Sequence, residues 1–410
     1  MKTKKMQIIK KSAILKKESI FSSCLIHVLL RYGSHCQECM RVVKAVIPCS
    51  SCCGVSFCSV GCRDLALASY HPTECGLNDV MTASGLNIYP SLTLRLMTRF
   101  GLEHIWSLRE KISHHDDRAG ALGEDEEYRS DDFVNAFNLV CHEDKNEDED
   151  HLLRTFVAVF LLKLLQFNNY FGVISEEQQL RERQNEEIDL SEKELFIGTL
   201  ILHFTNTFPQ NVHDIALLQT SVTSKWSNSG EIKSLGAGVF LTSALFNHSC
   251  DPSFMRCNFG KGMVSVANRN IKAGEEISEC YGQMYYTKNK EQRRAELERH
   301  YKFECCCLAC LEDWPTIREL QYATGGRETK HSHLMRVRCQ GCGQQLERMK
   351  GLRVASLLTC LVCGQETQVE DVPLEVIREA SLLAERLLCE RMDWVQGVRA
   401  VRECQVISSA

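Results

Sequence analysis

Cysteine pairs separated by two residues recur along this sequence of 410 residues. This spacing presents two thiolates to one tetrahedral zinc ion. The chain contains 23 cysteines, and a disulfide scaffold would not need the same spacing repeatedly. The sequence therefore predicts several zinc sites and a reducing compartment, for which we expect the cytoplasm and the nucleus. The pairs are Cys36/Cys39, Cys49/Cys52, Cys307/Cys310, Cys339/Cys342 and Cys360/Cys363.

Four pairs of potential ligands lie close together between residues 36 and 75. Such a short segment buries too little apolar surface to fold alone, so zinc ligation must supply the folding free energy, about 10 to 16 kcal/mol. Combining the first pair with the third and the second with the fourth gives two complete sites. Because protein atoms fill all four positions of each, both sites are predicted to be structural. The two ligand sets are Cys36, Cys39, Cys58 and Cys62, and Cys49, Cys52, His71 and Cys75.

A third set of thiolates is incomplete in the local sequence. The segment 305–310 provides three, Cys305, Cys307 and Cys310, and a closed structural site needs four. Cys250 is the predicted fourth ligand, because it ends an apolar run and is followed shortly by a proline. A fourth set has the spacing of a zinc ribbon, so we expect four zinc ions in all. The ribbon ligands are Cys339, Cys342, Cys360 and Cys363.

The stretch LFNHSCDPSF, residues 245–254, places His248 close to Cys250. Such a pair could be a nucleophile with its base or one corner of a metal site. We expect no catalytic dyad, because neighbouring residues of a strand point to opposite faces. In this interpretation Cys250 turns toward zinc and His248 faces the other side.

The elements expected around these residues are of both kinds, so the predicted fold class is α+β. Helical patterning dominates residues 76–232, most clearly in LLRTFVAVFLLKLLQFNNYFG and KELFIGTLILHFTNTF. The acidic run HEDKNEDED between those two segments is predicted to be a solvated loop. From about residue 233 the sequence changes to short strands with glycine and asparagine turns. Residues 287–302 are again predicted to be helical.

Composition argues against several classes of protein. The net charge of -5 disfavours a sequence-independent nucleic-acid binder, and we expect no sequence-specific nucleic-acid binding either. The lysine-rich start is no secretion signal, because His27 interrupts the apolar run that follows it. Arg154 and Lys163 break the longest apolar segment, which stays below the roughly 18 residues needed to span a bilayer. We therefore expect a soluble protein without membrane association.

NHSCDP, EEISECYG and YKFECCCLAC follow the first cysteine block in this order. That block, with Phe57 before Cys58 and Tyr70 before His71, resembles a MYND zinc finger. Together the motifs are similar to those of the SET and MYND domain-containing protein lysine methyltransferases. The resemblance extends over about residues 14–370. The GAGVF lead-in, the CYG ending and the additional cysteine pairs are similar to the branch of that family that carries amino-terminal tetratricopeptide repeats.

The resemblance implies a SET-type β-fold of short strands, interrupted by a MYND finger and a helical insert. A post-SET zinc site, a zinc ribbon and a short helical tail would follow, and the chain would be truncated at both ends relative to the family. The expected segments are a lysine-rich leader with a truncated start of the SET region (1–35), the MYND finger (36–75), the helical insert (76–232), the SET core (233–286), the post-SET segment (287–312), a linker with the ribbon (313–371) and a truncated helical region (372–410).

The resemblance also implies a protein-lysine N-methyltransferase that uses S-adenosylmethionine. Asn247 would bind the amino-acid end of this cofactor, the backbone of His248 would meet its adenine, and Phe303 would stack on the adenine. Tyr281 and Tyr301 would be the catalytic tyrosines of a lysine channel, with Tyr281 also contacting the cofactor. Aromatic faces suit the lysine stem and its cation, and hydroxyls can orient the nitrogen.

The partners implied are a lysine of a protein substrate and, through the MYND finger, proline-rich peptides of other proteins. We expect a monomer. A second hypothesis is a catalytically inactive adaptor or transcriptional co-regulator. Three departures from the family weaken the catalytic interpretation: no glycine-rich turn precedes ILKKES, Ser253 stands where the family has asparagine, and the family's carboxy-terminal helical array and the amino-terminal repeats of the nearest branch are expected to be mostly absent.

Overall fold

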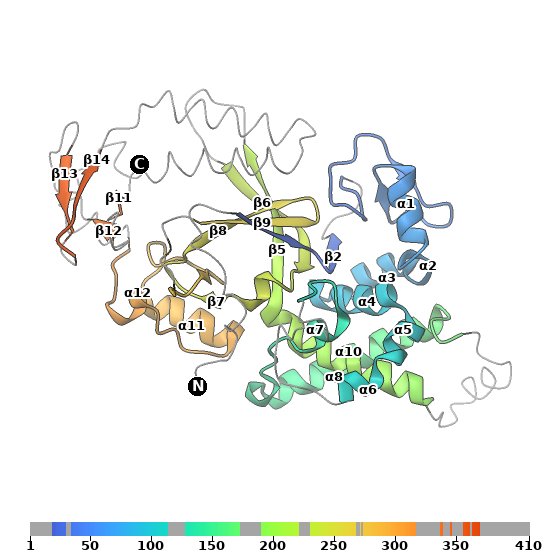
Figure 1. Ribbon diagram of the computed structural model, residues 1–410. Helices are drawn as coiled ribbons and strands as arrows, with labels where there is room; N and C mark the ends of the chain where they lie inside the picture. The colour runs from blue at the N-terminus through green and yellow to red at the C-terminus, as the bar shows by residue number, and fades with distance from the viewer. Residues whose placement is uncertain are drawn as a thin grey trace.

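The computed structural model describes residues 19–29, 34–113, 128–172, 190–220, 230–267, 271 and 274–316, together with short pieces at 337–338, 345–346, 356–360 and 363–369. Helices and strands are mixed in it, which confirms the α+β class (Figure 1). The leader, the carboxy-terminal region from 372 onward and the predicted ligands Cys339 and Cys342 lie outside the described residues.

Two strands near the start of the chain complete sheets whose other members lie far along the sequence. Strand β1 (Ser19–Ser23) pairs antiparallel with β9 (Gly262–Ala267), which also pairs with β8 (Phe254–Phe259). Strand β2 (Ile26–Leu29) pairs with β6 (Gly230–Val239), in a sheet of order β2-β6-β5. Residues 19–29 are therefore an integral part of the strand-rich core.

Close packing of two strands explains the glycine that begins the GAGVF motif, residues 236–240. A Cβ atom at Gly236 would lie 2.0 Å from the carbonyl oxygen of Val28, so β2 can approach β6 only because residue 236 has no side chain. Strand β5 (Val212–Thr220) pairs with the other edge of β6. This strand falls inside the region predicted to be helical, so the helical interpretation of 76–232 was wrong at its carboxyl end.

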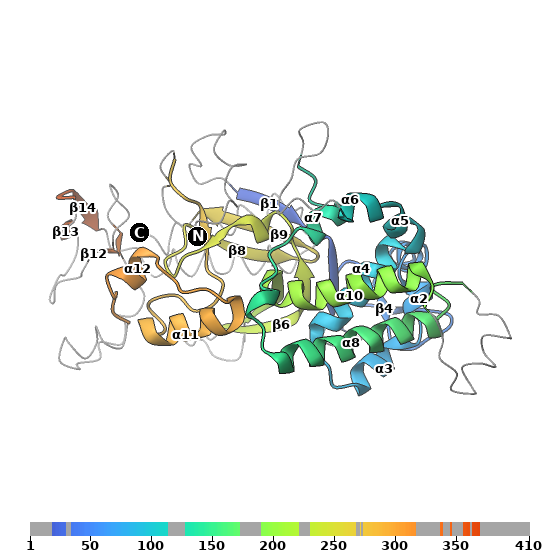
Figure 2. The same cartoon turned by 90° about the horizontal axis from the view of Figure 1, so that it is seen from below.

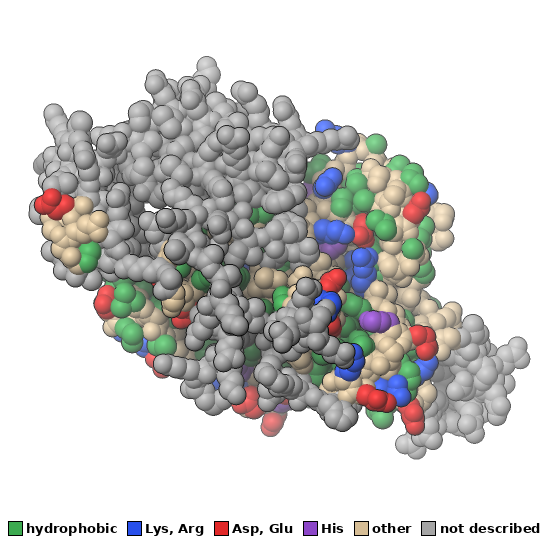
Figure 3. All heavy atoms as spheres, in the orientation of Figure 1, with side chains coloured by type: hydrophobic (Ala, Val, Ile, Leu, Met, Phe, Trp, Pro, Cys, Tyr) green, Lys and Arg blue, Asp and Glu red, His purple; other side chains and the backbone are tan. Residues whose placement is uncertain are grey.

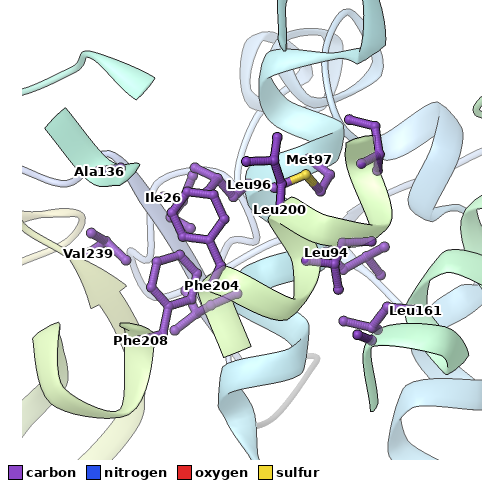
Figure 4. Close-up of a cluster of buried hydrophobic side chains, with 14 of the residues drawn as sticks. Ile26, Leu94, Leu96, Met97, Ala136, Leu161, Leu200, Phe204, Phe208 and Val239 are labelled. Atoms are coloured by element: carbon purple, nitrogen blue, oxygen red, sulfur yellow. The ribbon is translucent and has the colours of Figure 1, made fainter. Parts of the chain in front are cut away.

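The helical insert packs against β2 and β6 chiefly through its helix α4 (Ile88–Phe100) and through side chains of α10 (Glu192–Asn211). Its third long member is α8 (Asp148–Phe167), and α8 and α10 run side by side (Figure 2). The shorter members are α3 (Leu77–Ala83), α5 (Leu102–Ser107), α6 (Arg109–Ser113) and α7 (Phe133–Phe137). Phe204 and Phe208 of α10 meet Ile26 and Val239 of the strands in the core (Figure 4).

The two helices predicted from apolar patterning are confirmed as α8 and α10. A capping box at Ser191 and Glu194 begins α10. The acidic run was expected to be a loop, but Glu143–Lys145 forms the 3-10 turn η2 and Asp148 already begins α8. Acidic side chains stabilise the amino end of a helix through its dipole, which explains this difference.

The cysteine-rich finger contains β3 (Ile47–Pro48), β4 (Ser56–Phe57), α1 (Val60–Leu67) and α2 (His71–Glu74). Glu74 and Arg95 of α4 form a bidentate ion pair, with both nitrogen–oxygen distances at 2.7 Å and both side chains buried. The Arg95 guanidinium lies 3.7 Å from the ring centre of Tyr70 and also donates to the carbonyl of His27. The finger is thus fixed to the insert and to β2 at once.

A second buried carboxylate of the finger reaches the other sheet. Glu38 accepts from Lys261, which follows β8, at 2.9 Å, and lies 3.6 Å from Arg99 of α4. Gly260 has φ +58°, and a Cβ there would lie 2.6 Å from the carbonyl oxygen of Cys39. The turn between β8 and β9 therefore needs glycine both for its backbone and for its close approach to the finger.

In the region 313–371, where a zinc ribbon is predicted, the described residues include two pairs of antiparallel strands. Strand β11 (Val337–Arg338) pairs with β12 (Gln345–Leu346), and β13 (Ser356–Thr359) pairs with β14 (Glu366–Val369). Cys360 and Cys363 lie in the turn of the second hairpin, where the Cys360 N–H donates to Gln365. The zinc ribbon stays a prediction. In the parts of the chain that the structure describes, no helix combines the length and apolar character needed to cross a bilayer.

Glu74→Ala leaves the Arg95 guanidinium buried without its partner, and we expect the free energy of unfolding to fall by about 3 to 5 kcal/mol. Urea unfolding at a constant zinc concentration measures this free energy. Glu110→Ala is the control, because the Glu110 side chain is 80% exposed in its pair with Arg109. A change below about 0.5 kcal/mol is expected there. Equal unfolding free energies of the two variants would contradict this role of the Glu74 pair.

Candidate active site and zinc centres

Three clusters of cysteine and histidine side chains form among the described residues, with the ligand atoms of each cluster within 4.8 Å of one another. Zinc–sulfur bonds of about 2.3 Å in a tetrahedron place sulfur atoms about 3.8 Å apart. The sulfur separations match, for example 3.5 Å for Cys39 and Cys58 and 3.6 Å for Cys250 and Cys310. The donor sets fit zinc. They are Cys36, Cys39, Cys58 and Cys62; Cys49, Cys52, His71 and Cys75; and Cys250, Cys305, Cys307 and Cys310.

Short helices position the ligands of the finger. The Ser59 hydroxyl accepts from the N–H of Cys62 and caps α1, which brings the Cys58 and Cys62 sulfurs to 3.7 Å. His71 begins α2, and its Nε2 atom lies 3.5 Å from the Cys52 sulfur. Burial lowers the pKa of His71, so the imidazole stays in the neutral form that binds metal.

The third cluster joins Cys250 of the SET core to a segment that follows α11 (Lys290–Tyr301). Lys302 ends this helix in the left-handed conformation, and the chain then turns back through 305–310. The backbone N–H of Cys250 donates to the Cys307 sulfur at 3.4 Å. Hydrogen bonds from the Cys250 and Cys305 thiols hold the pKa of Cys307 well below its usual range.

His248 contacts this cluster directly. Its Nε2 atom lies 3.3 Å from the Cys250 sulfur, and its Nδ1 atom accepts from the N–H of Tyr281 at 3.0 Å. The expectation that His248 and Cys250 point apart was wrong, because residues two apart on an extended chain share a face. Since Nδ1 accepts, the proton is assigned to Nε2, which donates to the sulfur. Burial lowers the pKa of His248 to about 4, so this neutral imidazole bridges the cluster and Tyr281.

An aromatic cluster stands beside this bridge. The ring of Tyr281 lies 4.9 Å from that of Tyr301, 5.2 Å from His248 and 6.3 Å from Phe303, centre to centre. The Tyr301 hydroxyl donates to the Tyr281 carbonyl at 3.0 Å, and the Tyr281 hydroxyl donates to the Phe246 carbonyl. Burial raises the pKa of Tyr301 to about 12 and that of Tyr281 above its usual range. Both phenols therefore remain protonated donors.

Asn247 lies on β7 (Asn247–His248), which pairs parallel with β10 (Ser278–Glu279). Its amide donates to Glu276 at 2.7 Å, away from the hydrogen bonds of the aromatic cluster. Ser253, where the family has asparagine, is fully buried. Its hydroxyl donates to the Ser278 carbonyl at 3.2 Å and accepts from the Ser278 N–H at 2.8 Å. Serine therefore supplies both a donor and an acceptor for this turn.

Sequence reasoning missed a buried charged group next to Tyr281. Glu279 of β10 accepts from Arg256 of β8, and its Oε1 atom lies 3.4 Å from His213 of β5. Although burial opposes ionisation, His213 and Arg256 hold the pKa of Glu279 below its usual value. These contacts of Glu279 join the strands β10, β8 and β5. The glutamate in an otherwise strand-like run was the only signal, and its partners could not be identified from sequence.

The comparisons with known proteins agree with this arrangement. A family model described as SET domain matches residues 125–282. "Protein-lysine N-methyltransferase SMYD4" of Pongo abelii is 25% identical over 312 residues, and that of Homo sapiens is 24% identical over 313; each alignment covers 67% of this chain and 38% of the relative. "Histone-lysine N-methyltransferase SMYD3" of Mus musculus is 40% identical over 80 residues, which are 20% of this chain and 18% of the relative.

The fold and the site define a SET-domain protein with a zinc-binding finger inserted near its start. The chain is similar to the SET and MYND domain-containing (SMYD) family, and the relatives it matches include SMYD4 members. It spans 38% of the length of the first SMYD4 relatives.

Cys250→Ser removes one thiolate of the third cluster, and we expect the purified chain to contain one equivalent of zinc less per molecule. Elemental analysis measures the content. Cys306→Ser is a matched control, because Cys306 is exposed between two predicted ligands but belongs to no cluster of the described residues. Loss of zinc from the Cys306 variant as well would contradict the assignment of ligands.

Proposed function

We propose that the chain is a protein-lysine N-methyltransferase that uses S-adenosylmethionine. The observation that carries this proposal is the cluster of Tyr281, Tyr301 and Phe303 around His248, held against a zinc-type cysteine cluster. The SET-domain match and the printed names of the relatives support the same activity. The target lysine would belong to a protein.

The residues beside the cluster fit S-adenosylmethionine. Asn247 offers an amide for the charged amino-acid end, His248 a backbone for the adenine, and Phe303 a half-buried ring for stacking. When bound, the cofactor supplies an activated methyl group.

The residues of the chain would contribute alignment and exclusion of water. The Tyr281 and Tyr301 hydroxyls each donate to a backbone carbonyl, which fixes the phenol oxygens. The remaining lone pairs of these oxygens can accept from an amine and orient its nitrogen. Because both phenols are protonated and buried, they add no negative charge that would hold the lysine in its unreactive ammonium form.

Tyr281→Phe should lower kcat about 100-fold, since one oriented hydroxyl is lost at the reacting centre. Transfer of labelled methyl to a protein mixture measures activity, and calorimetry with S-adenosylhomocysteine measures cofactor binding. Tyr170→Phe is the control, because its hydroxyl also donates to a backbone carbonyl, that of Met97 at 3.0 Å, within the helical core. Absence of binding heat from the unmodified chain would contradict the enzyme and favour the adaptor.

We also propose that the finger docks proline-rich segments of partner proteins, in the cytoplasm and the nucleus. Several apolar side chains are exposed on the surface of the finger, where Figure 3 shows them spread among other side chains, and they are too exposed to belong to its core. The exposed fractions are 59% for Val42, 54% for Val46, 51% for Val60 and 59% for Leu65.

Replacing Val60 and Leu65 together by aspartate should weaken binding of a proline-rich peptide about tenfold or more, because charge would enter the apolar surface of α1. Fluorescence anisotropy of a labelled peptide measures Kd. Val159→Asp on α8 changes a residue of the same 51% exposure outside the finger and should leave Kd unchanged. Equal affinities of both variants would rule out this face of the finger.

A further inference from the structure

Arg293 of α11 is a buried cation without a carboxylate partner. Its residue surface is 1% exposed, and it is one of the largest fully buried side chains. Among the described residues, none of the ion pairs with Asp or Glu involves it. The neighbouring Arg294, by contrast, pairs with Glu304. A buried charge without compensation is strongly unfavourable, so the structure must balance Arg293 in another way.

The contacts of its guanidinium lead to the third zinc cluster. One nitrogen, Nη1, donates to the carbonyl oxygens of Tyr285 at 3.2 Å and Lys288 at 2.5 Å. The other, Nη2, donates to the carbonyl of Ala309 at 3.3 Å and to the sulfur of Cys310 at 3.5 Å. The planar fork thus holds three backbone carbonyls, from the two segments 285–288 and 309–310, and one predicted zinc ligand.

The charges explain why an arginine occupies this position. Four thiolates around one zinc ion carry a net charge of about -2, which is itself costly to bury. The guanidinium is cationic at every accessible pH, and its N–H groups face a sulfur of this centre. Metal centre and arginine therefore neutralise each other in part.

We propose that Arg293 is the counter-charge of the third zinc centre and a positioning residue for the wall of the candidate active site. The same helix carries Tyr301, and the segment it holds at Tyr285 follows Tyr281 closely in sequence. At another ligand of the centre, His248 links Cys250 to Tyr281. The inference goes beyond the proposed function, because it concerns retention of metal and needs no methyl transfer.

An N–H group that donates to a zinc-bound thiolate stabilises its negative charge and slows its protonation and release. Loss of such an outer-shell partner weakens metal binding about 10- to 100-fold. This effect should be confined to Cys250, Cys305, Cys307 and Cys310, because Arg293 donates to no ligand of the finger clusters among its hydrogen bonds.

The experiment uses the whole zinc-loaded chain, challenged with EDTA in the presence of N-ethylmaleimide. Peptide mass spectrometry then gives a labelling rate for each cysteine. For Arg293→Met we expect the four cysteines of the third cluster to be labelled about tenfold faster, with the finger cysteines unchanged. Arg299→Met is the matched control, since Arg299 lies on the same helix but is exposed. It should behave as the unmodified chain.

Arg293→Lys retains the positive charge without the planar fork, so its labelling rate should fall between those of the unmodified chain and Arg293→Met. If Arg293→Met does not fold, Arg293→Lys alone tests the proposal. A labelling rate of the third-cluster cysteines equal to that of the unmodified chain would then overturn it. Faster labelling spread equally over all clusters would reduce Arg293 to a general structural role. Rates for Arg293→Met equal to those for Arg299→Met, or absence of zinc from the third cluster, would overturn the inference.

Discussion

The meeting of Cys250 with Cys305, Cys307 and Cys310 is the constraint on which the site depends. These ligands are brought together from the SET core and from a segment that follows α11. They share a small hydrophobic cluster with Tyr285 and Leu297, but so short a segment buries too little apolar surface to be fixed without metal ligation. Their meeting also fixes the positions of the aromatic residues of the candidate active site. The imidazole of His248 connects the cluster to the backbone of Tyr281, and α11 brings Tyr301 against the same ring.

The finger is joined to the SET core through buried charges placed next to its metal ligands. Glu38 lies between two cysteines of one cluster, and Glu74 immediately precedes the last cysteine of the other. Their partners Lys261 and Arg95 come from the β8–β9 turn and from α4. The candidate metal sites of the finger and the core are therefore mechanically linked.

Sequence reasoning predicted the ligand sets well because a ligand pair is a local feature. The three sets that MYND-type and post-SET spacing indicated are the three groups that the described structure brings together, whereas half of the ribbon set lies outside the described residues. Apolar periodicity was sufficient for α8 and α10 but not for β5, whose strand character depends on pairing with β6. The orientation of His248 was wrong, because face alternation was applied to residues two apart.

The sequence by itself determined which side chains can bind metal, the α+β class and the resemblance to SET and MYND domain-containing proteins, since residue type and spacing carry that information. Only the tertiary structure decided the partners of charged groups far apart in the chain. Arg293 reads as an ordinary surface residue of a charged helix, and it becomes the counter-charge of a metal centre only when α11 packs on that centre. Likewise Glu279 acquires Arg256 and His213 only when three strands meet. The free energy of a buried charge depends on its whole surroundings, which no local pattern contains.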